Sequence, residues 1–315
     1  MAMSYRKPGY VYDGPIFDAH SHAADESALR LMVEVAAQYG VERRLLILHN
    51  AKPAAFEEKY PGRFVFAKFL MVSNLLSLEP DKLRAEIDSM AVDGYSVAKM
   101  HFAPLWIDRL AEQPLLSPVN DERLDTLFGV LEEMQIPVLI HVGDPDTYYA
   151  TRYANAERYG TKDKHISEFE DRLSRNSSLP FQVAHFGAQP EPERLDNLGR
   201  MFSKYSYLHV DTGSARWMAR ELGRNPSRAR EFIIRYSDRI LFGTDCVART
   251  LERGYYDGRY SSERLLWETK VRGVPLPFAD TDTENTGGTF INGLSLPKKV
   301  LSRLYWDNAQ ALYGL

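Results

Sequence analysis

The stretch IFDAHSHAADESALRLMVEVAAQYG, residues 16–40, contains a short apolar run followed by a helical pattern. Its first residues, 16–21, have the length and composition of a β-strand. Asp25 is placed to cap the helix that follows, and Gly40 is suited to end it. Apolar residues recur in the helix at intervals of three and four, namely Ala28, Leu31, Met32, Val35, Ala36 and Tyr39. The stretch therefore predicts a strand followed by an amphipathic helix.

This strand-and-helix unit recurs along the chain. Several of the later apolar runs are nearly continuous, as in strands buried on both faces of a parallel sheet. After residues 16–21, the predicted strands are 43–49, 64–70, 95–101, 137–142, 180–186, 207–212 and 240–244. Helical patterns fill most of the gaps. Eight alternating units predict an α/β fold, a closed (β/α)8 TIM barrel, and the alternative with the same alternation is a doubly wound open sheet.

The chain shows no internal repeat and no linker, so we expect a single domain over residues 1–315. Residues 246–296 are rich in Gly, Tyr, Thr and Asp and have no clear periodicity. A loop of that length in a compact domain is usually functional or disordered. Because it follows the eighth predicted strand, we expect it to be an active-site loop insertion.

Composition excludes several classes of protein. The 315 residues are 44% hydrophobic and 26% charged with a net charge of −4, and no basic block is present, so nucleic acid is not an expected partner. No apolar run approaches the ~20 residues of a membrane span, and the first residues have no signal-peptide core. The single cysteine, Cys246, excludes an intramolecular disulfide framework. We expect a cytoplasmic protein.

Histidines and one aspartate stand where the predicted strands end. His20 and His22 point to the same side of their strand because side chains alternate. Alone, such a pair fits a structural role as well as a metal site. Other predicted strands, however, end in His101, His141, His185 and Asp245. The strand ends of a barrel converge on one face, so we expect these side chains to meet there.

Imidazole and carboxylate groups suit a borderline divalent cation. Three or four such ligands with one open position are typical of a catalytic zinc site, and manganese is the alternative. A bound ion of this kind lowers the pKa of water to about 7. A histidine outside the ligand set then serves as a general base or as an electrostatic contact to the substrate.

The motifs resemble those of the amidohydrolase superfamily, most closely the amidohydrolase 2 or aminocarboxymuconate-semialdehyde-decarboxylase-like branch. The resemblance spans nearly the whole chain: FDAHSH, VAKMHF, PVLIHVG, VAHFG, ILFGTD and the closing LYWDNAQALYGL. It implies that one metal ion is bound by His20, His22, His141 and Asp245. It also implies that His185 is a catalytic residue, assisted by Asp245.

Other polar residues near the strand ends are candidates for substrate binding. Lys99 and His101 share one side of the fourth strand, and Lys99 either holds a substrate carboxylate or, carboxylated as in some superfamily members, bridges a second metal. Arg216 is suited to clamp a carboxylate through its planar fork, although a solvated arginine fits the pattern equally well. Asp144 follows the fifth predicted strand, Asp211 stands near the end of the seventh, and both are further expected contacts.

Two reactions fit these residues. The first, which we expect because the resembling superfamily is predominantly hydrolytic, is metal-dependent hydrolysis of a small carbonyl substrate such as a lactone or an amide. The second is decarboxylation of an unsaturated or aromatic carboxylic acid, since the resembling branch contains both chemistries. A non-catalytic metal- or metabolite-binding protein is the third hypothesis, which the complete ligand set disfavours. We expect a small, carboxylate-bearing substrate, and the family resemblance suggests a homodimer.

Overall fold

The computed structural model describes residues 10–49, 51–75, 78–109 and 118–315. Nine parallel strands lie next to one another in the order β8-β7-β6-β5-β4-β3-β2-β1-β9. They are β1 Ile16–Ala23, β2 Val41–Leu48, β3 Phe64–Phe69, β4 Val97–His101, β5 Val138–His141, β6 Phe181–Val183, β7 Leu208–Asp211, β8 Ile240–Leu241 and β9 Cys246–Ala248. All eight predicted strands are present, within a few residues of their expected ends.

The sheet closes through the segment that contains β8 and β9. β8 pairs with β7 and β9 pairs with β1, both in parallel. The residues that connect β8 to β9 also bond to β1. The N–H of Ala19 donates to the carbonyl of Phe242 at 2.7 Å, and the N–H of Asp245 donates to the carbonyl of His20 at 2.8 Å. The prediction of a closed (β/α)8 barrel is therefore confirmed.

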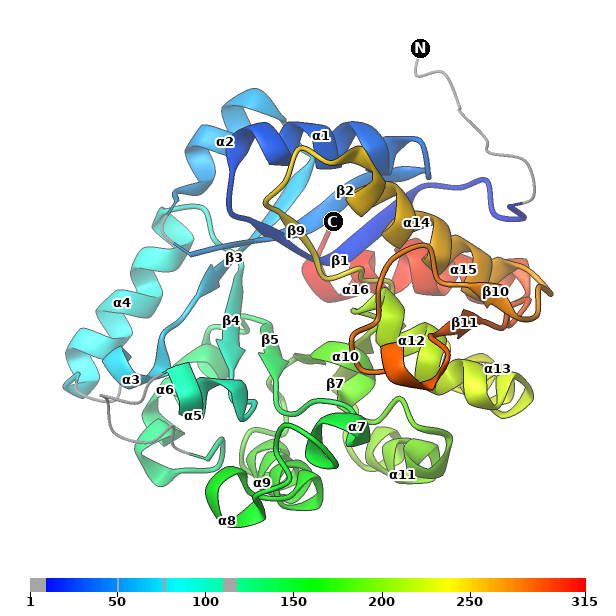
Figure 1. Ribbon diagram of the computed structural model, residues 1–315. Helices are drawn as coiled ribbons and strands as arrows, with labels where there is room; N and C mark the ends of the chain where they lie inside the picture. Colours follow the sequence, from blue (N-terminus) through cyan, green and yellow to red (C-terminus); the bar gives the residue numbers. More distant parts are fainter. Residues whose placement is uncertain (1–9, 50, 76–77, 110–117) are drawn as a thin grey trace.

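Helices surround the barrel (Figure 1). They are α1 Glu26–Ala37, α2 Pro53–Lys59, α3 Val72–Leu75, α4 Pro80–Val92, α5 Leu105–Arg109, α6 Asp125–Glu133, α7 Asp146–Tyr149, α8 Ala156–Tyr159, α9 Lys162–Arg175, α10 Ala184–Gly187, α11 Leu195–Lys204, α12 Ala215–Glu221, α13 Pro226–Arg235, α14 Arg253–Glu268, α15 Lys298–Ser302 and α16 Asn308–Tyr313. α1 begins as predicted, because the Asp25 carboxylate accepts from the Ala28 N–H at 2.7 Å. No helix of the described ranges is long and apolar enough to cross a membrane.

Two apolar clusters fill the fold. The larger lies between the strands and the helices, and the smaller is built mainly from alternate strand residues. Members of the smaller cluster are Phe17, Ala19, Leu45, Ile47, Val65, Ala67, Val97, Leu139, Ala184, Leu241 and Ala309. Tyr313 of α16 packs on this cluster beside Phe17, with ring centroids 5.6 Å apart. The C-terminal helix thus lies where the strands begin.

The interior alternation places polar groups where the strands end. His141 stands two residues after interior Leu139, and Lys99 two residues after interior Val97, so both share the interior side of their strands. In β1 the pairing register shifts between Asp18 and Ser21. Strict alternation would turn His20 away from the interior, because it directly follows interior Ala19. We attribute the inward position of His20 to the register shift.

The expectation that residues 246–296 lack regular structure is wrong. The segment contains β9, the sixteen-residue helix α14, and a two-stranded antiparallel pair formed by β10 Val274–Pro275 and β11 Phe290–Ile291. The helical pattern is obscured because the buried face of α14 contains Glu263, Arg264 and Glu268 among its apolar residues. The Arg264 guanidinium, for example, donates to the carbonyl of Tyr12 at 2.8 Å. That this segment covers the active site stays a prediction.

Candidate metal centre and active site

Six histidine rings form a continuous row where the strands end. Successive ring centroids are 5.9 Å apart for His49–His22, 5.4 Å for His22–His20, 5.5 Å for His20–His185, 4.4 Å for His185–His141 and 4.1 Å for His141–His101. His20 and His22 come from β1, His101 from β4 and His141 from β5. His49 directly follows β2, and His185 lies in the turn Ala184–Gly187 (α10) after β6. The convergence predicted from the strand ends is therefore present in the fold.

His20, His22 and Asp245 bring three potential ligand atoms together. The Asp245 Oδ1 atom lies 3.4 Å from His20 Nε2 and 3.3 Å from His22 Nε2. Ligand atoms of the three residues all fall within 4.8 Å of one another. Two imidazole nitrogens and a carboxylate oxygen are donors typical of a zinc or manganese site.

The protonation states of these groups suit a cation. Burial lowers the pKa of His22 to about 4, so its ring is neutral at pH 7. Burial alone would raise the pKa of Asp245, but the nearby His20 ring and a hydrogen bond from His22 hold it well below its usual range. The His20 Nδ1 atom is 3.1 Å from the Asp211 carboxylate. If Nδ1 carries the proton of a neutral His20 ring, the Nε2 lone pair faces the Asp245 carboxylate. These two acceptors repel each other, and a cation bound between them removes the repulsion. The residues present therefore fit a divalent metal.

His141 is the neighbour of His185 in the row of rings and is not one of the three residues whose ligand atoms lie within 4.8 Å of one another. Its Nε2 atom is 2.9 Å from the Asp144 Oδ1 atom, and the hydroxyl of Tyr153 donates to Asp144 Oδ2 at 2.9 Å. Asp144 is only 3% exposed. Both of its oxygens are thus occupied by protein groups, and the Nδ1 atom of His141 is the nitrogen left for a metal. That His141 binds metal and that Asp144 binds substrate stay predictions.

His185 lies in a tight turn after β6. Its φ and ψ angles are 58° and 51°, in the left-handed region. Its Nδ1 atom is 2.6 Å from the carbonyl of Gly213, and its ring and that of Trp217 form a T-shaped contact with centroids 4.7 Å apart. Burial lowers the pKa of His185 to about 3. A neutral ring that donates from Nδ1 to the Gly213 carbonyl retains an acceptor at Nε2.

Asp211 is fully buried and is surrounded by donors. Its Oδ2 atom accepts a hydrogen bond from Gln182 Nε2 at 2.7 Å and lies 3.1 Å from His20 Nδ1. Its Oδ1 atom accepts the backbone N–H groups of Gly213 at 3.0 Å and His185 at 3.2 Å. The sequence suggested a substrate contact here, but protein groups occupy both oxygens. Gln182 was not singled out, although a glutamine inside the apolar run FQVAH was the available signal.

The predicted substrate-binding residues take different positions. Lys99 is 2% exposed, and burial lowers its pKa to about 8 against the opposing charges of Asp211 and Asp245. His101 contacts Trp106 edge to face, with centroids 5.7 Å apart. Arg216 Nη2 donates to the hydroxyl of Tyr148 at 3.1 Å. Substrate binding by Lys99, His101 and Arg216 stays a prediction.

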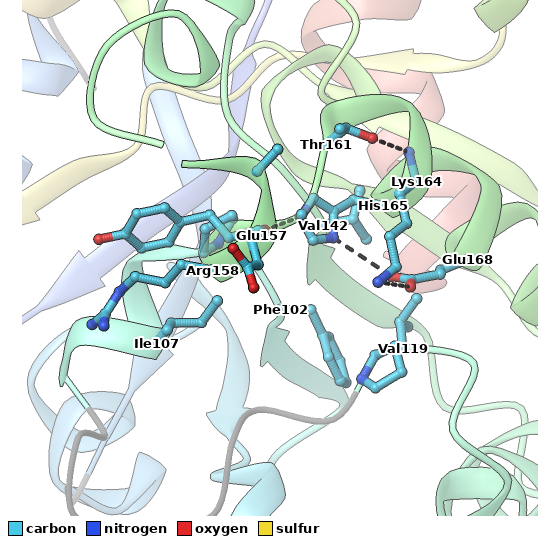
Figure 2. A pocket seen from close by; sticks show the side chains of 15 residues that line it. Phe102, Ile107, Val119, Val142, Glu157, Arg158, Thr161, Lys164, His165 and Glu168 are labelled. Carbon is cyan, nitrogen blue, oxygen red and sulfur yellow. Dashed lines mark hydrogen bonds and ion pairs between the residues drawn. The ribbon is translucent and has the colours of Figure 1, made fainter. Parts of the chain in front are cut away.

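A cavity of about 310 Å³ lies outside the barrel wall, next to α8 and the start of α9 (Figure 2). Phe102 and Val142, which line it, directly follow His101 and His141, so their side chains leave the opposite face of the strands. His165 also lines the cavity, and its Nε2 atom is 2.8 Å from the carbonyl of Tyr159. This cavity is therefore separate from the row of histidines.

Comparison with known proteins agrees with this architecture. A family model described as Amidohydrolase matches residues 17–315. A comparison with curated protein sequences finds no match.

Solved structures resemble the chain over nearly its full length. A 2,6-dihydroxybenzoate decarboxylase complexed with 2,6-dihydroxybenzoate is 14% identical with a TM-score of 0.59, over 96% of this chain and 99% of that one. An uncharacterised TIM-barrel protein from Bordetella bronchiseptica is 14% identical with a TM-score of 0.58, over 95% and 98%. A dihydroorotase from Campylobacter jejuni is 12% identical with a TM-score of 0.54, over 95% and 83%. At these identities the likeness shows the fold.

Proposed function

The chain belongs to the amidohydrolase family, and on that premise we propose that it is a metal-dependent hydrolase of a small carbonyl compound such as a lactone or an amide. The observation that carries the proposal is the meeting of His20, His22 and Asp245 within ligand distance of one another, in the same row of rings as His185. Three ligands next to a histidine with a free acceptor nitrogen make an arrangement suited to activating water.

His20, His22 and Asp245 would hold one divalent ion, with His141 as the fourth ligand through Nδ1. We propose zinc, with manganese as the alternative. Such an ion acts as a Lewis acid toward a carbonyl oxygen and lowers the pKa of water to about 7. Two metal equivalents per chain would instead support the carboxylated form of Lys99.

The chain's own groups manage the proton and the substrate. His185, with Nδ1 directed to the Gly213 carbonyl, accepts a proton at Nε2 and returns it to the leaving group. The second carboxylate oxygen of Asp245, Oδ2, assists this proton transfer. Lys99 and Arg216 attract a carboxylate on the substrate, and burial strengthens the attraction to Lys99.

Decarboxylation of an unsaturated or aromatic carboxylic acid is the second candidate. The buried cation of Lys99 near the metal ligands favours it as much as hydrolysis, because both reactions then use a carboxylate-bearing substrate. In decarboxylation His185 would first accept a proton from water at Nε2 and then deliver it to the carbon that loses CO₂. A cytoplasmic location and a homodimer complete the proposal.

The reactions separate in ¹⁸O-labelled water with a panel of lactones, amides and aromatic carboxylic acids. Hydrolysis places label in the organic product. Release of CO₂ together with an unlabelled organic product would establish the decarboxylase. His185→Ala should lower turnover by about 10²- to 10⁴-fold. His165→Gln, in the cavity outside the barrel, is the matched control and should leave turnover unchanged. Full turnover by His185→Ala, or less than a tenth of an equivalent of metal after reconstitution, would overturn the mechanism.

A further inference from the structure

Asp211 is the buried group through which the site is held together. It is 0% exposed, and each of its oxygens faces two donors. An ionised carboxylate only accepts hydrogen bonds, so every one of these four partners must present a proton to it. Gln182 and the two backbone N–H groups do so in any state. For a neutral His20 ring the requirement selects between the two tautomers.

We propose that Asp211 is a positioning residue that fixes His20 in the Nδ1–H tautomer and so keeps its Nε2 lone pair available for a cation. The 3.1 Å contact between His20 Nδ1 and Asp211 Oδ2 supplies the constraint. The other ring nitrogen, Nε2, then lies 3.4 Å from Asp245 Oδ1 without a proton to share in the neutral ring. Carboxylate partners of ligating histidines act in this way on tautomer and orientation.

The substitution Asp211→Asn tests this selection because the two oxygens of Asp211 have different partners. Oδ1 faces the backbone N–H groups of His185 and Gly213, which cannot become acceptors. The amide oxygen of the new asparagine must therefore take the Oδ1 place, and its NH₂ group must take the Oδ2 place. There it faces Gln182 Nε2, which remains a donor, and His20 Nδ1, which can accept from it only by transferring its proton to Nε2. That tautomer cannot bind metal through Nε2.

The first measurement uses the metal-free wild-type protein with ¹⁵N-labelled histidine. Long-range ¹H–¹⁵N spectra distinguish the two tautomers by the nitrogen chemical shifts. We expect the Nδ1–H form for His20 in the wild type and the Nε2–H form in Asp211→Asn, with His20→Gln used to assign the resonances. A wild-type His20 in the Nε2–H form overturns the proposal even if the variant does not fold.

The second measurement is zinc affinity, determined by competition with a chromogenic chelator, and this part rests on the proposed metal site. Asp211→Asn should bind zinc about 10- to 100-fold more weakly than the wild type. Glu263→Gln is the matched control, since Glu263 is a fully buried carboxyl bonded to Trp267, and its affinity should equal that of the wild type. If the wild type binds zinc, equal affinity of Asp211→Asn and the wild type overturns the proposal.

The two measurements also separate this inference from the proposed function. If the wild type binds no zinc but His20 changes tautomer in Asp211→Asn, the positioning role of Asp211 stands and the proposed metal-dependent function falls. If the wild type binds zinc and neither affinity nor tautomer responds to Asp211→Asn, the proposed function stands and the positioning role falls.

Discussion

His20 and His141 are both predicted metal ligands, and each has one ring nitrogen occupied by a buried carboxylate. Asp211 faces Nδ1 of His20, whereas Asp144 faces Nε2 of His141. The nitrogens left for a cation are therefore Nε2 of His20 and Nδ1 of His141. Identical residue types thus present different atoms, and the difference depends on the partner rather than on the histidine.

Outside the site, Glu170 is a residue through which acid should weaken the fold. Its carboxylate pairs with Arg200 at 2.6 Å and Lys204 at 3.1 Å, and these contacts, chiefly the hydrogen bond from Arg200, lower its pKa from 4.5 to about 2. A depressed pKa contributes stability that is present above 4.5 and is lost as the pH falls toward 2.

We therefore expect wild-type protein to lose about 1–2 kcal/mol more unfolding free energy than Glu170→Gln between pH 6 and pH 3. Urea unfolding curves at a series of pH values measure the difference. Glu133→Gln, which changes a carboxylate 65% exposed, is the control and should follow the wild type. Identical pH dependence of Glu170→Gln and the wild type would contradict the prediction.

At the scale of elements, Arg220 of α12 joins parts of the chain that are far apart in sequence. Its guanidinium pairs with Asp280 and Asp282 at 2.9 Å and with Glu221 at 2.6 Å, and it donates to the hydroxyl of Thr147 in α7. The chain between β10 and β11 is thereby held against elements that follow β5 and β7. Since those elements lie after the strand ends, this contact brings part of residues 246–296 toward the face that bears the histidines.

Arg220→Ala should lower the unfolding free energy by about 3–5 kcal/mol, because it leaves buried carboxylates without their cation. The unfolding free energy of Arg220→Lys should lie between those of Arg220→Ala and the wild type, since lysine retains the charge and loses the planar fork. Urea unfolding provides the measurement. The control is Arg224→Ala, whose side chain is 51% exposed and whose loss should cost less than about 1 kcal/mol. Equal losses for Arg220→Ala and Arg224→Ala would show that the buried cluster does not stabilise the fold.

At the scale of the whole molecule, the proposed metal would link residues from opposite ends of the sequence at the point where the barrel closes. His20 and His22 belong to β1, and Asp245 lies between β8 and β9. An ion that binds the native state and not the unfolded chain adds about 4 kcal/mol at a concentration one thousand times its Kd.

Removal of the metal with a chelator should therefore lower Tm by several degrees, and added zinc should restore it. Differential scanning calorimetry measures both steps. His22→Ala should abolish the zinc-dependent part of Tm, whereas His165→Gln should retain it. A wild-type Tm that is the same with chelator and with zinc would mean that no metal couples to folding.

The fold was largely predictable because the barrel repeats a local pattern. Short apolar strands and amphipathic helices such as Glu26–Ala37 are encoded within a few residues, and their alternation limits the architecture. The helix α14 was not predicted, because its buried face contains polar residues whose hydrogen-bond partners lie far away in the sequence. Tyr260 of α14, for example, donates to Asp18 at 3.1 Å, across 242 positions of sequence.

The sequence by itself determined the family, the barrel and the set of histidines and aspartate at or near its strand ends, since short motifs and the succession of strands and helices are encoded by neighbouring residues. The tertiary structure alone decided which atoms of those residues remain free. Asp211, Asp144 and Gly213 occupy one nitrogen each of His20, His141 and His185. Hydrogen bonds between strands and turns far apart in sequence depend on closure of the barrel, and no local pattern records which nitrogen they take.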